Sequence, residues 1–162
     1  MSLQLVRPIA FLDLETTGVN LSTDRIVEIA IIKILPDGSR QAKRKLLNPQ
    51  MPIPAVTTAI HGITDEMVKD APTFKQAGNE LKQFIENCDM GGYNSNRFDI
   101  PMLMEEFLRA GMDVDLSARR MVDVQHIFLH HGTPHPNCGL QILLRKGTDR
   151  CPQCRIGCEC ND

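Results

Sequence analysis

Two apolar segments near the start of the chain constrain the fold more than any other feature of the sequence. The run at 8–15, PIAFLDLE, ends in a pair of carboxylates, and the run at 25–35, RIVEIAIIKIL, is almost continuously apolar. Short runs rich in isoleucine and valine are typical of buried strands. After the turn signal at 36–38, the segment 40–48 alternates more weakly and suits an edge strand. We expect three antiparallel strands here.

Further along the chain, the pattern alternates between helix and strand. Several prolines mark a long connection over 48–73, which contains a short helix capped by Thr64. A helix over 74–85, a brief strand over 89–94 and a second helix over 100–111 follow. The second helix carries one apolar stripe, formed by Ile100, Leu103, Met104, Phe107 and Leu108. Strands followed by alternating helix and strand predict an α/β fold with a mixed sheet.

Composition favours a globular chain with one main domain. The chain has 162 residues, 42% of them apolar and 23% charged, and lacks an apolar run of the roughly 18 residues that cross a bilayer. The N-terminus shows no export signal, so we expect a cytoplasmic location and no membrane partner. A net charge of −2 argues against a broad basic surface for duplex nucleic acid, so any such contact is expected in a local site.

Three carboxylates are candidates for a metal site. Asp13 and Glu15 leave the first strand on the same side, because side chains alternate along a strand. Their repulsion favours a cation between them, although a strand that ends in solvent would also explain the pair. Asp99 lies at a strand–helix junction, where aspartate is a favoured N-cap. If the three converge at one edge of the sheet, their hard oxygen donors suit Mg²⁺ or Mn²⁺.

The residues around these carboxylates resemble a known enzyme family. FLDLETTG at 11–18 and GYNSNRFDIPML at 92–103 are similar to the first two motifs of the DEDD superfamily of 3′–5′ exonucleases, in the branch of the DNA polymerase III epsilon subunit. HGIT at 61–64 and the aspartate of MVDVQHIF at 121–128 also match the pattern, so the resemblance spans residues 8 to about 128. It implies a ribonuclease H-like mixed sheet of about five strands flanked by helices. It also implies hydrolysis of nucleotides from a 3′ end by Asp13, Glu15 and Asp99 with two divalent cations, Mg²⁺ or Mn²⁺.

The same resemblance indicates substrate-binding residues and partners. Thr16 and Thr17 could offer backbone N–H groups to the terminal nucleotide, and Phe98 could stack on its base, although a buried core phenylalanine is an equal alternative. Asn94 and His61 are further candidates, with His61 also able to cap the short helix that follows it. The expected partners are the single-stranded 3′ end of DNA or RNA and a DNA polymerase subunit; the sequence does not choose between DNA and RNA.

One part of the family pattern is missing. The family has a histidine followed five residues later by an aspartate, which serve as general base and fourth carboxylate. None of the five histidines here has an aspartate at that spacing. Asp113, Asp115 or Asp123 could substitute for the absent aspartate, although Asp123 already matches another position of the pattern. The composition also changes abruptly near residue 129, which divides an exonuclease domain at 1–128 from a Cys/His-rich tail at 129–162.

A change of reading frame accounts for both the missing motif and the tail. When each codon is read one base later from Gly132 onward, the wobble positions permit a helix-like segment followed by His-Ser-Ala-Glu-Ser-Asp, which has the required spacing. Our hypothesis is that a one-base insertion near codon 129 has replaced the end of an exonuclease with out-of-frame residues. The sheet would then be incomplete at its C-terminal end, and the enzyme would be impaired.

The alternative is a genuine tail that binds zinc. It contains a Cys-x-x-Cys spacing, and four cysteines could supply a tetrahedral site: Cys151, Cys154, Cys158 and Cys160, with Cys138 or His135 as substitutes. The protein would then be a non-catalytic module that binds nucleic acid or protein. Against this alternative, only one residue separates Cys158 from Cys160, and the tail has no hydrophobic core of its own.

Overall fold

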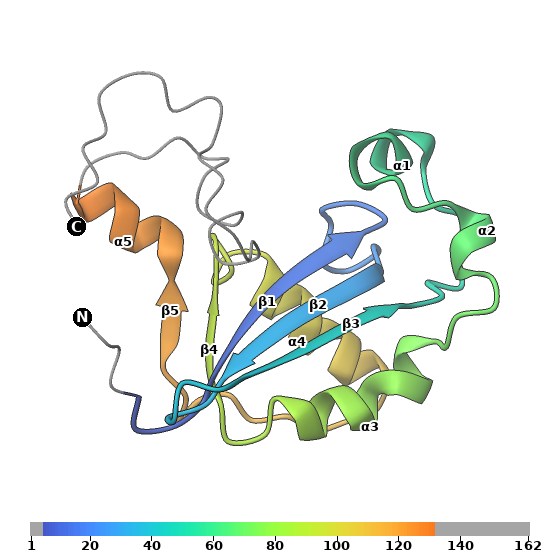
Figure 1. Cartoon of the computed structure of the whole chain (residues 1–162). Helices are drawn as coiled ribbons and strands as arrows, with labels where there is room; N and C mark the ends of the chain where they lie inside the picture. Colours follow the sequence, from blue (N-terminus) through green and yellow to red (C-terminus); the bar gives the residue numbers. More distant parts are fainter. Residues whose placement is uncertain (1–4, 132–162) are drawn as a thin grey trace.

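The computed structural model describes residues 5–131, which form a five-stranded sheet with helices (Figure 1). The order of the strands across the sheet is β3-β2-β1-β4-β5. Their bounds are β1 Ile9–Thr16, β2 Ile26–Ile34, β3 Arg40–Leu46, β4 Asp89–Gly92 and β5 Met121–Asp123. Strand β1 therefore occupies the centre of the sheet, with the two later strands on one side of it and the two hairpin partners on the other.

The pairing of the strands makes the sheet mixed, as the sequence predicts. Strand β1 pairs with β2 antiparallel along its whole length, and β2 pairs with β3 in the same way. Strand β4 pairs with β1 in parallel, and β5 pairs with β4 in parallel. Parallel neighbours need a crossover connection. Helices α3 (Phe74–Phe84) and α4 (Asp99–Arg109) lie within the connections that lead to β4 and β5.

The main core lies between one face of β1 and these two helices. Ala10, Leu12 and Leu14 alternate along β1 and are all buried, as the period of two along a strand requires. The rings of Phe74 on α3 and Phe107 on α4 meet edge to face, with centroids 5.1 Å apart. Such aromatic pairs add to the stabilisation that comes from burial alone. The two helices are thereby held against each other and against the sheet.

The buried face of α4 differs from the predicted stripe. Leu108 is 71% exposed and Met104 is only half-buried, whereas Met102 is fully buried. Glu106, 1% exposed, lies on the same buried face. The prediction was wrong for Leu108 because the stripe was drawn through apolar residues alone. The buried face of the helix includes a glutamate, which hydrophobic periodicity does not detect.

A smaller core supports the long connection after β3. It contains two helices, α1 (Ala55–His61) and α2 (Asp65–Val68), where the sequence predicted one. Thr64 caps α2 as expected, because its side chain accepts a hydrogen bond from the backbone N–H of Met67. Four buried residues from β2 and this connection pack together: Val27, Ile53, Ile63 and Val68. No helix within residues 5–131 is long and apolar enough to cross a membrane.

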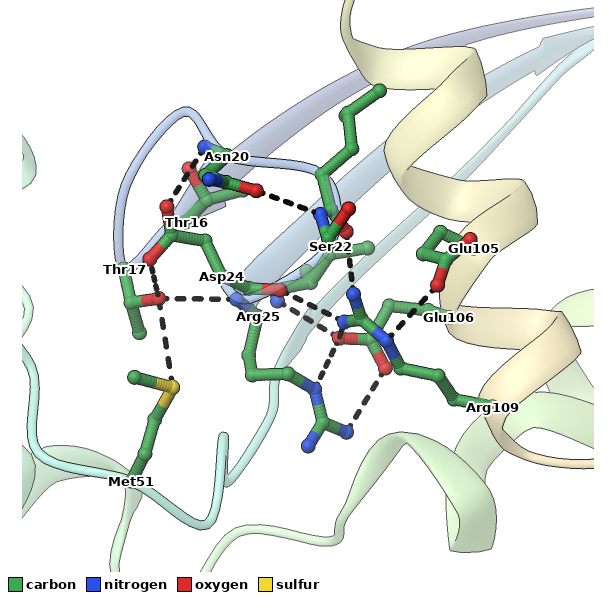
Figure 2. A network of polar contacts seen from close by, with 12 residues as sticks. Thr16, Thr17, Asn20, Ser22, Asp24, Arg25, Met51, Glu105, Glu106 and Arg109 are labelled. Atoms are coloured by element: carbon green, nitrogen blue, oxygen red, sulfur yellow. Dashed lines mark hydrogen bonds and ion pairs between the residues drawn. The ribbon is translucent and has the colours of Figure 1, made fainter.

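A buried ion-pair network fastens the loop between β1 and β2 to helix α4 (Figure 2). Both oxygens of Glu106 accept hydrogen bonds from the guanidinium of Arg25, at 2.6 and 3.0 Å. Arg109, one turn further along α4, lies 3.5 Å from Glu106 and donates to the backbone carbonyls of Leu21 and Asp24. The loop that follows β1 is thus held from the helix side by charged groups.

Replacing Glu106 with glutamine should destabilise the protein by about 3 kcal/mol, because Arg25 would lose its buried counter-charge. Urea denaturation measures the change. Glu105→Gln is the matched control: Glu105 is partly exposed and pairs with Arg109 at 3.4 Å, so its loss should cost less than about 1 kcal/mol. Equal losses of unfolding free energy in the two variants would show that the buried ion pair contributes no more than the partly exposed one.

Candidate active site

The first two carboxylates lie on the face of β1 that points away from the main core. Phe11, Asp13 and Glu15 alternate with the buried residues of the strand and are each partly exposed. Phe11 lies across β4 at Gly91, where a Cβ atom would come within 2.7 Å of the ring. A glycine at this position lets the aromatic ring close one end of the face. Asp13 and Glu15 therefore do share one side of the sheet.

Asp99 joins them from the first turn of α4. The N-cap of this helix is Phe98, which makes no side-chain capping hydrogen bond, and Asp99 is the first helical residue. Capping therefore does not explain the aspartate. Its side chain is 8% exposed, and the backbone N–H groups that lower its pKa are its own and that of Leu14 on β1. The structure thus brings Asp99 to β1 at the residue that separates Asp13 from Glu15.

Burial, and after it the charge of Asp13, disfavours ionisation of Asp99 and Glu15. Burial, followed by the charge of Asp13, raises the pKa of Asp99 to about 7. Burial also raises the pKa of Asp13 and of Glu15; Glu28 adds to the effect at Asp13, and Asp13 adds to it at Glu15. A group of buried carboxylates of this kind is costly without cations, and such groups concentrate at functional sites.

A fourth acidic residue, Glu28, lies directly opposite Glu15 on the neighbouring strand. Its two oxygens accept hydrogen bonds from the guanidinium of Arg44 on β3, at 2.7 and 3.0 Å. This bidentate pair neutralises Glu28, whereas Asp13 and Asp99 have no arginine or lysine partner among the described residues. Sequence analysis missed Glu28, although a glutamate inside an otherwise apolar strand was a usable signal.

Asp13, Glu15 and Asp99 do not form a closed metal cage in this conformation. Within residues 5–131, no three His, Cys, Asp or Glu side chains are grouped closely enough to hold an ion. The donor chemistry nonetheless fits a hard divalent cation, because the three groups offer carboxylate oxygens and burial raises the pKa of each. Ligation by all three would require movements that draw the carboxylates together.

The two threonines after the carboxylates organise the loop that leaves β1. Thr16 is buried and donates its hydroxyl to the carbonyl of Gly18 at 2.7 Å. The hydroxyl of Thr17 donates to Asp24 at 3.0 Å, and its backbone N–H donates to the carbonyl of Arg25 at 2.9 Å (Figure 2). The N–H that we expected Thr17 to offer to a nucleotide is therefore already engaged within the loop.

The other candidate substrate-binding residues surround the site from separate elements. Phe98 is half-buried against the main core. Its exposure is therefore intermediate between the two predictions, a free ring that stacks on a base and a fully buried ring. Asn94 stands in the left-handed region with φ 54° and is partly exposed. His61 is the last residue of α1, and its charge lowers the pKa of Glu15, which places the ring on the carboxylate side of the sheet.

The hydrogen bonds of His61 fix its tautomer. Its Nδ1 accepts from the backbone N–H of Ile63 at 3.0 Å, so a neutral ring carries its proton on Nε2. That Nε2 atom is buried and has no partner within the described part of the chain. A buried donor without a partner is uncommon in folded proteins and calls for an explanation. The position of His61 beside Glu15 favours one explanation, in which a bound ligand supplies the acceptor for Nε2–H.

Comparison with known proteins identifies the family. Residues 10–129 match the exonuclease family RNase_T. The chain belongs to this family. A DNA polymerase III subunit epsilon-like protein of Rhodobacter capsulatus is 38% identical over 107 residues, which cover 64% of this chain and 15% of that protein. The DNA polymerase III subunit epsilon of Buchnera aphidicola is 33% identical over 107 residues, covering 61% of this chain and 45% of the relative.

Solved structures agree on the fold. Exonuclease I superposes with a TM-score of 0.67 over 75% of this chain and 29% of its own, at 18% identity. An E. coli Exonuclease I structure in complex with a dT13 oligonucleotide gives a TM-score of 0.65 at 19% identity. The expected ribonuclease H-like mixed sheet and the resemblance to the epsilon branch are therefore confirmed. The chain spans less than half the length of these relatives, so their activities and partners are not transferred to it by the match alone.

The tail carries predictions that lie outside the described residues. They are the displaced His-Ser-Ala-Glu-Ser-Asp segment, which would begin near Pro152, and the alternative zinc ligands Cys151, Cys154, Cys158 and Cys160. The family match ends at residue 129, close to the predicted change of domain. The division at 128 and the origin of the tail stay predictions.

Replacing Asp99 with asparagine should stabilise the metal-free protein on the order of 2 kcal/mol at pH 8. With a pKa near 7 when folded and near 3.8 when unfolded, Asp99 lowers stability progressively as pH rises between these values. Urea denaturation in EDTA measures the gain, and the exposed Asp113→Asn serves as the control that should change little. A loss of stability in Asp99→Asn would show that the carboxylate is not held against Asp13.

Proposed function

We propose that this protein is a metal-dependent 3′–5′ exonuclease that removes nucleotides from single-stranded ends. The observation that carries the proposal is the convergence of Asp99 on β1 beside Asp13, where burial and the charge of Asp13 raise the pKa of both Asp99 and Glu15. Buried acids that serve the structure are normally paired with cationic side chains, as Glu28 is with Arg44 and Glu106 is with Arg25. Membership of the exonuclease family supports the same activity.

Asp13, Glu15 and Asp99 would hold two divalent cations, Mg²⁺ or Mn²⁺. When bound, such ions supply an activated water and stabilise the leaving 3′ oxygen in an in-line hydrolysis. The chain's own part is to hold the carboxylates on one face of β1 and to exclude bulk water from Asp99. Glu28 stays out of the cluster because Arg44 occupies both of its oxygens.

Residues around the cluster suit a terminal nucleotide. The Nε2–H of His61 lies on the carboxylate side and would donate to a phosphate or ribose oxygen of the strand. Phe98, half-exposed next to Asp99, would stack on the terminal base, which is how proteins hold single strands of any sequence. Thr16, Thr17 and Asn94 would shape the pocket through their backbones. Either DNA or RNA satisfies these contacts.

The relatives named as polymerase subunits suggest the setting of the reaction. We infer action on a DNA 3′ end beside a DNA polymerase subunit, in the cytoplasm, from the epsilon-type relatives. A stand-alone nuclease would use the same site. Fold alone does not separate the two roles, because one scaffold supports both.

Binding of Mn²⁺ should raise the melting temperature of the chain. An ion at one hundred times its Kd stabilises the folded state by about 2.7 kcal/mol, which a thermal shift assay with MnCl₂ detects. Asp13→Asn should lose this response. Asp70→Asn, an exposed acid in the connection after α2, should keep it. A response that survives Asp13→Asn would place the ion elsewhere.

The reading frame decides whether the functional enzyme is longer than this chain. We propose that a one-base insertion near codon 129 displaced the histidine and the fourth carboxylate. The first test is the nucleotide sequence across codons 120–162, read independently from the source DNA. An open shifted frame that spells His-Ser-Ala-Glu-Ser-Asp supports the insertion. A frame that reads otherwise would make the Cys-rich tail genuine, and zinc analysis of the purified protein would follow.

Restoring the frame should raise activity about 10²- to 10⁴-fold, because a positioned general base contributes a factor of that size. The assay follows shortening of a 5′-labelled single-stranded oligonucleotide in Mg²⁺, with the 162-residue chain and the restored chain side by side. Asp13→Asn in the restored chain is the negative control. Equal rates for the two chains would show that residues 129–162 do not supply the base.

A further inference from the structure

The carboxylate of Asp123 is buried, is not used by the catalytic proposal and makes no salt bridge within residues 5–131. Asp123 is the last residue of β5 and is 6% exposed. Its Oδ1 accepts hydrogen bonds from the backbone N–H of Asn94 at 2.9 Å and of Gln125 at 3.0 Å. Its Oδ2 accepts from the backbone N–H of Asn96 at 3.4 Å. Two of these three donors belong to the loop that precedes Asp99.

That loop, residues 93–98, connects β4 to α4 and carries Phe98 at its end. Its path is unusual, because Asn94 adopts a left-handed conformation with φ 54°, which residues other than glycine rarely do. Backbone N–H groups that lie outside a strand ladder need another acceptor, and the strand pairs of residues 5–131 supply none to Asn94 or Asn96. Asp123 meets this need from β5, which pairs with β4 and is therefore fixed beside the loop.

We propose that Asp123 is a positioning residue for the active site: by accepting the N–H groups of Asn94 and Asn96, it sets the loop that aims Asp99 at β1. The inference rests on the proposed function, for which Asp99 must meet Asp13 and Glu15. Asp123 is assigned to the loop and not to the ligand set because its oxygens accept three backbone N–H groups. It therefore does not replace the aspartate that is missing from the family pattern.

Hydrogen exchange tests whether Asp123 holds the loop. In Asp123→Ala, the amides of Asn94 and Asn96 should exchange at least about tenfold faster by NMR, whereas those of Leu12 and Ile31 within the β1–β2 pair should be unchanged. If the alanine variant folds poorly, Asp123→Asn replaces it. This variant keeps one acceptor oxygen and should give a smaller effect. Asp115→Ala is the matched control, since Asp115 accepts a single backbone N–H, from Ser117, in a separate loop.

Exchange of the Leu14 amide tests whether the loop positions Asp99. The backbone N–H of Leu14 hydrogen-bonds to Asp99, so in Asp123→Ala it should exchange at least about tenfold faster. The Kd for Mn²⁺, measured by calorimetry on the full chain, should rise at least about tenfold in Asp123→Ala and stay constant in Asp115→Ala.

The outcomes separate this inference from the proposed function. Unchanged exchange at Asn94, Asn96 and Leu14 overturns the role of Asp123 whatever the chain does with Mn²⁺. If these amides exchange faster while the unsubstituted chain binds no Mn²⁺, the positioning role stands and the metal-dependent function fails. Faster exchange together with weaker Mn²⁺ binding supports both.

Discussion

Strand β1 has to satisfy opposite demands on its two faces, and most of the structure follows from how it does so. One face packs Ala10, Leu12 and Leu14 into the core, and the other carries Asp13 and Glu15. The first demand requires a central strand covered by α3 and α4. The second requires that no helix bury the opposite face completely, since unpaired carboxylates need either water or cations. Because side chains alternate between the two faces of a strand, β1 can present an apolar face and an acidic face at once.

The buried acids of this chain fall into two groups according to their partners. Glu28 and Glu106 each face an arginine in bidentate geometry and serve the scaffold: one ties β2 to β3, the other ties α4 to the loop after β1. Asp13 and Asp99 have an acidic neighbour instead, and burial together with the charge of that neighbour raises their pKa. This contrast separates scaffold from site without reference to sequence motifs.

The sequence predicted most of the sheet and the three carboxylates because those features depend on local periods. Alternation along 8–15 placed Asp13 and Glu15 on one side, and the strong apolar run at 25–35 placed β2 beside them. Two of the failures share one cause, which is polar burial: Glu106 lies on the buried face of α4 while Leu108 is exposed, and Glu28 was recognised only when register set it opposite Glu15. The buried Glu106 is paired with Arg25, which comes from a distant element.

Convergence of the site follows from the direction of the strands. Strands β1, β4 and β5 run parallel to one another, so their carboxyl ends meet at one edge of the sheet, where ligands bind in open α/β sheets. Glu15 is the next-to-last residue of β1, the loop to Asp99 leaves β4, and Asp123 ends β5. Each residue reaches the same edge through a different strand, so none could be assigned a partner before the strand order was known. The same geometry explains how a buried aspartate on β5 can contact the loop that leads to Asp99: β5 is the strand next to β4, from which that loop leaves.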